Sequence, residues 1–219
     1  FRIEIAGGEP FCHPDLAAIV SAVSRRHHVL LVTSLPTDTR AVLDGFDPAR
    51  VSFSVSFHPS HARLEELLPK VKGLARAGFP VSTSIVAYPP HFPGLEGWLS
   101  AFRGEGLRCY LNPFQGSFAG RDYPRSYTEA ESSFVRGNSF PDAMDLRLGE
   151  ERPFGRLCRA GWKYFRIWPD GVIHRCCAAT ELGLPPLGHI RDEAVPVDSA
   201  AAPCPARRCF APNEVICLV

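Results

Sequence analysis

The chain begins with Phe1-Arg2-Ile3-Glu4-Ile5-Ala6-Gly7-Gly8-Glu9-Pro10. Hydrophobic residues alternate with charged ones over the first five positions, which is the period-two pattern of a β-strand. Two glycines follow, and glycine adopts backbone angles closed to other residues and lets a ligand approach the main chain. A helix is expected next, with an apolar face formed by Leu16, Ile19, Val20 and Val23. The stretch therefore predicts a strand, a tight turn and a helix, with the turn at the end of the strand where α/β proteins bind ligands.

The alternation of strand and helix continues over the first 115 residues. We expect further strands at 28–34, 50–57, 81–87 and 107–111, and helices at 39–43, 63–77 and 95–102. This alternation predicts parallel βαβ units, arranged either as a barrel or as an open doubly wound sheet. No Gly-x-Gly-x-x-Gly follows any of these strands, which argues against a dinucleotide-binding fold.

Polar residues gather where the predicted strands end. They are Thr33, Ser34, Ser56, His58, Asn112 and Gln115. Each by itself is also an ordinary turn or cap residue. Because the carboxyl ends of parallel strands meet at one edge of a sheet, their shared location predicts a polar site there.

Composition limits the classes of function. Among 219 residues, 24 Lys and Arg stand against 23 Asp and Glu, so net charge gives no support for binding to nucleic acid or to an anionic membrane. No apolar run approaches the roughly 20 residues of a membrane-spanning helix. Six of the eight cysteines follow residue 150, which suits a cysteine-ligated metal lobe better than scattered disulfides, although a secreted disulfide framework stays open.

The cysteine-rich end contains a predicted hairpin. Residues 164–176 form two β-branched and aromatic runs around Pro169-Asp170-Gly171, a turn sequence. Cys158 precedes this hairpin and Cys176 ends it, while Cys177 is expected to point the other way along the same strand. Later cysteines stand at 204, 209 and 217. Four thiolates suit both iron–sulfur clusters and structural zinc, so the residues alone leave the metal open.

Three parts are expected along the chain. An α/β core spans 1–116, and a cysteine-rich hairpin lobe spans 155–219. Between them, 117–154 is punctuated by Gly and Pro and reads as a linker with one short helix near 127–131.

The Gly7-Gly8-Glu9-Pro10 turn after a strand resembles the S-adenosylmethionine-binding turn of the radical SAM superfamily, where it holds the methionine amino group. The resemblance implies that polar strand-end residues, here Ser34, Ser56, His58, Asn112 and Gln115, contact the ribose and the methionine carboxylate. Ser56 and His58 match the family's Ser-x-Asp with His in place of Asp, which puts the ribose contact in question.

The cysteine-rich end resembles the twitch or SPASM-type extension of the same superfamily, in which a Cys, a hairpin containing Asp-Gly, a second Cys and later paired cysteines hold an auxiliary 4Fe-4S cluster. The resemblance implies Cys158, Cys176, Cys204 and Cys209 as ligands, with Cys217 in reserve.

Together these resemblances imply a partial (β/α)6 barrel lacking its first βα unit, followed by a small hairpin lobe. They imply an oxidoreductase that cleaves S-adenosylmethionine to a 5′-deoxyadenosyl radical, acts on a small-molecule or peptide substrate, and takes electrons from a donor such as flavodoxin or ferredoxin in the cytoplasm. The family's Cys-x-x-x-Cys-x-x-Cys motif is absent from this sequence. We therefore expect a second 4Fe-4S cluster on an N-terminal segment that precedes it, and no activity from these residues alone.

Two alternatives belong to other classes of protein. One is a non-catalytic binding module that has kept the radical SAM fold. The other is a cytosolic α/β protein with a structural zinc ribbon.

Overall fold

The computed structural model describes residues 1–36, 43–140, 144–209 and 217–218, and the predicted helix at 39–43 lies almost wholly outside them. The chain divides into two compact units, Phe1–Asn112 and Pro113–Val219. The segment 117–154, expected as a linker, falls inside the second unit together with the cysteine-rich lobe.

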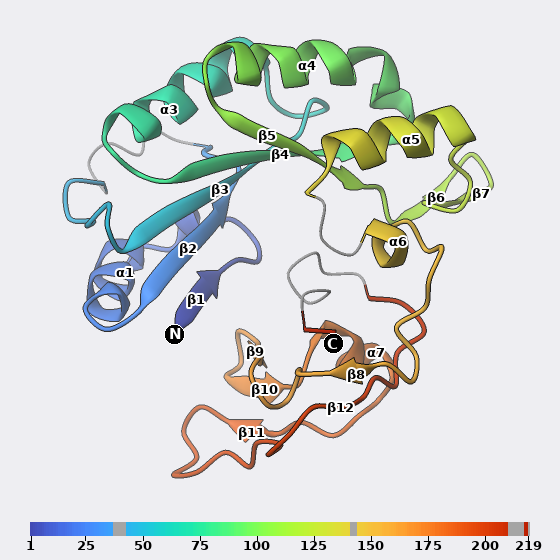
Figure 1. Cartoon of the computed structure of the whole chain (residues 1–219). Coiled ribbons are helices and arrows are strands. Elements are labelled where there is room, and N and C mark those ends of the chain that lie inside the picture. The colour runs from blue at the N-terminus through green and yellow to red at the C-terminus, as the bar shows by residue number, and fades with distance from the viewer. Residues whose placement is uncertain (37–42, 141–143, 210–216, 219) are drawn as a thin grey trace. The chain divides into compact units, whose positions relative to one another are not determined.

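The first unit is built on a five-stranded parallel sheet (Figure 1). Its strands lie in the order β1 (Arg2–Ile5), β2 (His28–Thr33), β3 (Val51–Phe57), β4 (Val81–Ala87) and β5 (Arg108–Pro113). The α/β class is confirmed. The strand order follows the chain without reversal, so the described sheet lacks the switch point of a doubly wound fold. The outermost described strands are β1 and β5, and closure into a (β/α)6 barrel stays a prediction.

Helices cover one face of this sheet, as the ribbon in Figure 1 shows. They are α1 (Leu16–Ser24), α3 (Leu64–Arg76) and α4 (Phe92–Gly104), with short 3-10 turns η1 (Pro10–Cys12) and η2 (Pro89–His91). The helix α3 runs on through Pro69 and ends before Gly78, whose φ of +88° suits glycine at a helix end.

Strand β3 shows why one face is covered. Val51, Phe53, Val55 and Phe57 are buried, whereas the serines between them are half-buried on the other face. Full burial of each such side chain stabilises the fold by about 1.5–3 kcal/mol. Phe53 also contacts Phe79 edge-to-face, with ring centroids 5.2 Å apart, which adds to this core.

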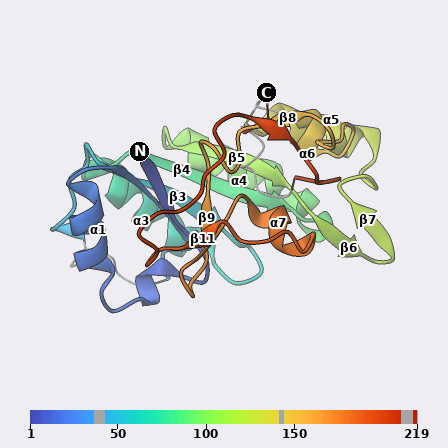
Figure 2. The ribbon, with the colours of Figure 1, turned by 90° about the horizontal axis from the view of Figure 1, so that it is seen from below.

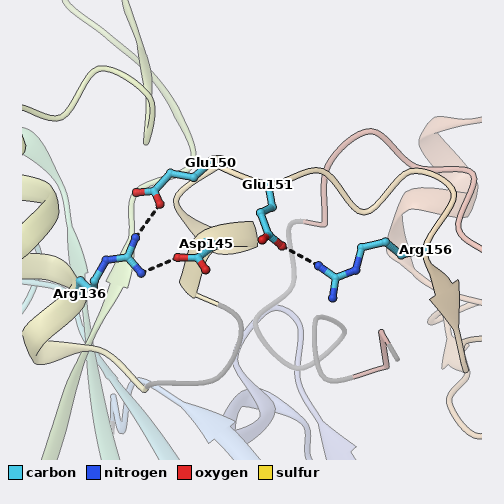
Figure 3. A network of polar contacts seen from close by, with 5 residues as sticks. All are labelled: Arg136, Asp145, Glu150, Glu151 and Arg156. Carbon is cyan, nitrogen blue, oxygen red and sulfur yellow. Dashed lines mark hydrogen bonds and ion pairs between the residues drawn. The ribbon is translucent and has the colours of Figure 1, made fainter.

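The second unit begins with a short two-stranded ribbon, which two helices follow. The ribbon is formed by β6 (Gly116–Phe118) and β7 (Arg121–Tyr123) and is visible in Figure 2. Helix α5 (Glu129–Asn138) starts with a capping box between Thr128 and Glu131. Arg136 of α5 then reaches Asp145 of α6 (Met144–Arg147) at 2.6 Å and Glu150 at 2.7 Å (Figure 3). These ion pairs are half-exposed, and such pairs contribute about 0–1 kcal/mol.

The cysteine-rich part contains the predicted hairpin. Its elements are β8 (Leu157–Cys158), β9 (Arg166–Ile167), β10 (Val172–His174), α7 (Cys177–Glu181), β11 (Gly188–His189) and β12 (Ala202–Pro203). β9 and β10 pair antiparallel, and the turn between them has Gly171 at φ +86° and an Asp170 Oδ1 that accepts from the Val172 N–H at 3.0 Å. This part of the prediction is confirmed.

One detail of the hairpin differs from expectation. Strand β10 ends at His174, and Cys176 is the N-cap of α7, whose first residue is Cys177. The two neighbouring cysteines therefore lie at a junction of strand and helix rather than on opposite faces of one strand. None of the helices in the described part of the chain has the length and apolar character needed to span a bilayer.

Candidate functional site

The turn after β1 exposes its main chain. Gly7 has φ +92° and Gly8 has φ +53°, backbone angles that residues other than glycine adopt only at a cost in conformational energy. A Cβ placed on either glycine would meet no described atom within 4 Å, so open space lies beside this backbone. Pro10 is buried and starts η1, which fixes the exit of the chain from the turn.

The carboxylate of Glu9 is directed back into the protein rather than towards this space. Its Oε1 accepts from Thr33 Oγ1 at 2.6 Å and from the Phe11 N–H at 3.1 Å. Its Oε2 accepts from both the N–H and the Oγ of Ser34, at 2.8 and 2.7 Å. A carboxylate offers about four acceptor sites, so these four hydrogen bonds use its capacity.

The pKa of Glu9 reflects this arrangement. Partial burial by itself raises the pKa, but the hydrogen bonds from Thr33, Ser34 and Phe11 outweigh burial and hold the pKa below its usual value. The charged form is therefore the one that holds the end of β2 to the turn after β1.

Thr33 belongs to the polar strand-end group predicted from the sequence, but the family resemblance did not imply it as a ligand contact. It is 3% exposed, donates to Glu9, and accepts from the Leu35 N–H at 2.9 Å. Its place at the end of a predicted strand, one residue before Ser34, was the available signal.

The other predicted strand-end residues occupy different places. Ser56 is half-buried on the helix-free face of β3, in register with Ser84 of β4, and His58 is exposed directly after β3. Asn112 is half-buried in β5. Gln115 belongs to the second unit, where its Nε2 donates to the Arg147 carbonyl at 2.9 Å. The structure thus brings Glu9 and Ser34 into contact, and places Ser56 and His58 at the carboxyl end of β3.

A second histidine lies near His58. His91, at the end of η2 after β4, has its Nε2 3.0 Å from Ser60 Oγ, and its ring meets those of Tyr88 and Trp98 edge-on. Burial and, to a lesser degree, the charge of His58 lower the pKa of His91. The neutral imidazole is therefore favoured at pH 7. Sequence patterns gave no signal for this pair, since His91 stands in a Pro-rich turn.

The eight cysteines all lie in the described part of the chain and are thiols. Cys12 is exposed, and Cys109 is buried in β5, where burial raises its pKa to about 12. In the second unit, Cys158 and Cys217 are buried in one cluster, and Cys176 and Cys204 pack against it. This group we call the thiol cluster.

Contacts within the thiol cluster are close. A hydrogen bond with Cys158 and, next, burial raise the pKa of Cys204. The Ala160 N–H points to Cys158 Sγ at 3.5 Å, a contact that stabilises a thiolate.

Cys209, predicted as a ligand, lies close enough to Cys204 for its charge to raise the Cys204 pKa. It lines a small hollow with Gln115, Arg207 and Arg208 and is not a member of the thiol cluster. Within the described residues, no three His, Cys, Asp or Glu side chains are arranged to hold a metal ion.

No protein-family model matches the chain, and no curated protein matches its sequence.

Proposed function

We propose that this chain carries the S-adenosylmethionine-binding core and the auxiliary-cluster lobe of a radical SAM enzyme. The observation that carries the proposal is the Gly7-Gly8 turn, which offers exposed main chain at the carboxyl end of a parallel strand. When bound, S-adenosylmethionine with a reduced 4Fe-4S cluster supplies a 5′-deoxyadenosyl radical that removes a hydrogen atom from the substrate.

The residues of the turn have separate tasks in this proposal. Because the Glu9 carboxylate is saturated by Thr33, Ser34 and Phe11, the acceptors left for an ammonium group are the backbone carbonyls beside Gly7 and Gly8. Glu9 holds these carbonyls in place and is a positioning residue. Ser56, His58 and Asn112 are proposed to bind the hydroxyl and carboxylate oxygens of the same ligand.

The auxiliary 4Fe-4S cluster is proposed for Cys158, Cys176 and Cys204, with Cys209 as the fourth ligand and Cys217 in reserve. The four thiols of the thiol cluster, two buried and two partly buried, are donors of the kind that iron–sulfur clusters use. The thiols match the group in kind and number, and when bound it would pass an electron or anchor the substrate.

The reaction needs a second 4Fe-4S cluster. The 219 residues contain no Cys-x-x-x-Cys-x-x-Cys, so we propose that this cluster is held by a segment outside them. A donor such as flavodoxin or ferredoxin would reduce it, and the reducing cytoplasm would keep its thiolates available. The substrate is proposed to be a small molecule or a peptide.

The test compares the 219-residue chain with the protein extended through its upstream coding sequence. After anaerobic reconstitution and reduction with dithionite, the extended protein should convert S-adenosylmethionine to 5′-deoxyadenosine, and the 219-residue chain should not. An extended protein that binds S-adenosylmethionine without cleaving it would make the chain a non-catalytic binding module. 5′-Deoxyadenosine from the 219-residue chain would overturn the assignment of the reactive cluster to another segment.

A further inference from the structure

We propose that the second unit binds a neutral sugar in a hollow of about 360 Å³ beside the turn between β9 and β10. The hollow is lined by Trp168, Pro169, Asp170, His174 and Thr180, and we call it the hairpin hollow. Its volume lies in the range of about 300–1,000 Å³ that small-molecule sites occupy. None of its five lining residues belongs to the glycine turn or to the thiol cluster, so the proposal does not depend on the proposed function.

The turn that carries the hairpin hollow is held by its own hydrogen bonds. The Trp168 N–H donates to the Val172 carbonyl at 2.9 Å, and the Gly171 N–H donates to the Trp168 carbonyl at 2.8 Å. The Asp170 carbonyl accepts from His189 Nε2 of β11 at 2.8 Å. The lining side chains therefore stand on a backbone that is already ordered, which lowers the conformational entropy lost when a ligand binds.

Two nitrogen atoms of the lining residues have unused hydrogen-bonding capacity. Trp168 Nε1 and His174 Nδ1 are both buried and have no hydrogen-bond partner among the described residues. Their rings stand nearly perpendicular, at 86°, with centroids 6.4 Å apart. An indole N–H can only donate, whereas an imidazole Nδ1 donates or accepts according to its tautomer. Because a buried polar group without a partner costs free energy, a ligand oxygen that accepts from the indole N–H is favoured.

The two exposed polar residues of the hairpin hollow need other partners. The Asp170 carboxylate can only accept, and although its Oδ1 already accepts from the Val172 N–H at 3.0 Å, a carboxylate has about four acceptor positions. The Thr180 hydroxyl both donates and accepts. A ligand that satisfies the indole and the carboxylate together must carry acceptors and donors. Hydroxyl groups supply both from one atom.

The charges beside the hairpin hollow favour a neutral ligand. The Asp170 carboxylate disfavours an anion. The Arg166 guanidinium lies 5.2 Å from the centroid of the Trp168 ring and disfavours a second cation on that ring. Trp168 and Pro169 offer apolar surface. A neutral sugar has hydroxyls around its edge and C–H groups on its faces, so it meets all of these conditions in one small ring.

The test uses the indole N–H signals of the 219-residue chain, which contains three tryptophans. Glucose, galactose and mannose are titrated separately to high millimolar concentration and followed in a proton–nitrogen correlation spectrum. At least one sugar should shift the Trp168 signal and leave the signals of Trp98 and Trp162 in place, since these two lie outside the hairpin hollow. The Trp168 signal is the one lost in Trp168→Phe. If that variant does not fold, Trp98→Phe and Trp162→Phe assign the other two signals.

Calorimetry on variants tests the contacts. Trp168→Phe keeps an aromatic ring and removes the N–H, so it should weaken the affinity for the sugar that binds by about tenfold. Trp162→Phe is the matched control and should keep the affinity. Glucuronate, a sugar with a carboxylate, should bind the wild type more weakly than glucose does. Asp170→Asn keeps an oxygen for the Val172 N–H and should reduce this difference.

Three outcomes overturn the proposal. They are an unmoved Trp168 signal with all three sugars, equal shifts of all three indole signals, and tighter binding of glucuronate than of any neutral sugar. Each of them leaves the S-adenosylmethionine turn untouched, because that turn belongs to the first unit.

Discussion

Glu9 and Ser34 are joined twice, because Glu9 Oε2 accepts both the backbone N–H of Ser34 at 2.8 Å and its hydroxyl at 2.7 Å. The two residues follow neighbouring parallel strands and lie 25 positions apart in the chain. The double contact holds the exposed glycine turn after β1 to the end of β2. The shape of the candidate ligand site therefore depends on the Glu9 carboxylate, although this group need not contact the ligand.

Glu9→Gln should destabilise the chain by about 1–2 kcal/mol, because an amide cannot accept all four hydrogen bonds and presents an N–H₂ to other donors. Urea unfolding followed by circular dichroism measures the loss. Glu66→Gln, on the exposed side of α3, is the control and should change little. Equal losses in the two variants would contradict the role given to Glu9.

The same contact predicts how stability depends on pH. Because the pKa of Glu9 is lower in the folded chain than in the unfolded chain, its contribution is fully present above the unfolded value of about 4.3 and is lost as the pH falls through the folded value. Unfolding free energies from pH 7 to pH 3 should therefore fall more steeply for the wild type than for Glu9→Gln. Parallel curves would remove Glu9 as a source of the acid sensitivity.

Gly8→Val should weaken S-adenosylmethionine binding tenfold or more in the protein that carries the reactive cluster. A β-branched residue disfavours the φ of +53° at this position, and its side chain would fill the open space beside the turn. Isothermal calorimetry measures the affinity. Gly8→Asn is the matched variant, since Asn tolerates this backbone conformation, and it should keep the fold. Unchanged affinity in Gly8→Val would exclude the turn from the site.

In an NMR titration of the imidazole signals, the pKa of His91 should lie below the usual value for a histidine, because burial and the charge of His58 both disfavour its protonated form. His58→Gln removes the second of these causes and should raise the His91 midpoint part of the way towards its usual value. No change in the midpoint would show that the two rings do not interact.

Thr83→Val should stabilise the chain by about 1 kcal/mol. Thr83 is 1% exposed on the helix-covered side of β4, and its Oγ1 has no hydrogen-bond partner among the described residues. Valine has nearly the same shape without a buried hydroxyl to satisfy. Thermal unfolding checks the sign, with Thr180→Val at an exposed position as the control.

Local patterns were enough for the five strands of the sheet, for helices α1, α3 and α4, and for the hairpin. The alternation in residues 51–57 and the helical spacing in 64–76 are set by which side chains must leave water, and the Pro-Asp-Gly turn by the conformations of its own three residues. These are short-range effects, so they can be predicted from residues that are neighbours in the sequence.

The pairing of distant residues needed the tertiary structure. That Glu9 meets Thr33 and Ser34 follows from the parallel register of β1 and β2, in which Ile5 lies beside Leu31. The strand ends at Ser56 and His58 could be predicted as one edge, but the approach of His91 to Ser60 arises from the path of a loop, which periodicity does not encode.

The sequence by itself determined that the chain would form a parallel α/β core with an open glycine turn, followed by a cysteine-rich part that contains a hairpin, because composition and period fix which side chains are buried. Only the tertiary structure decided which thiols lie together. Cys217 lies beside Cys158 because the main chains of these two distant segments pair, and no local sequence pattern encodes that pairing.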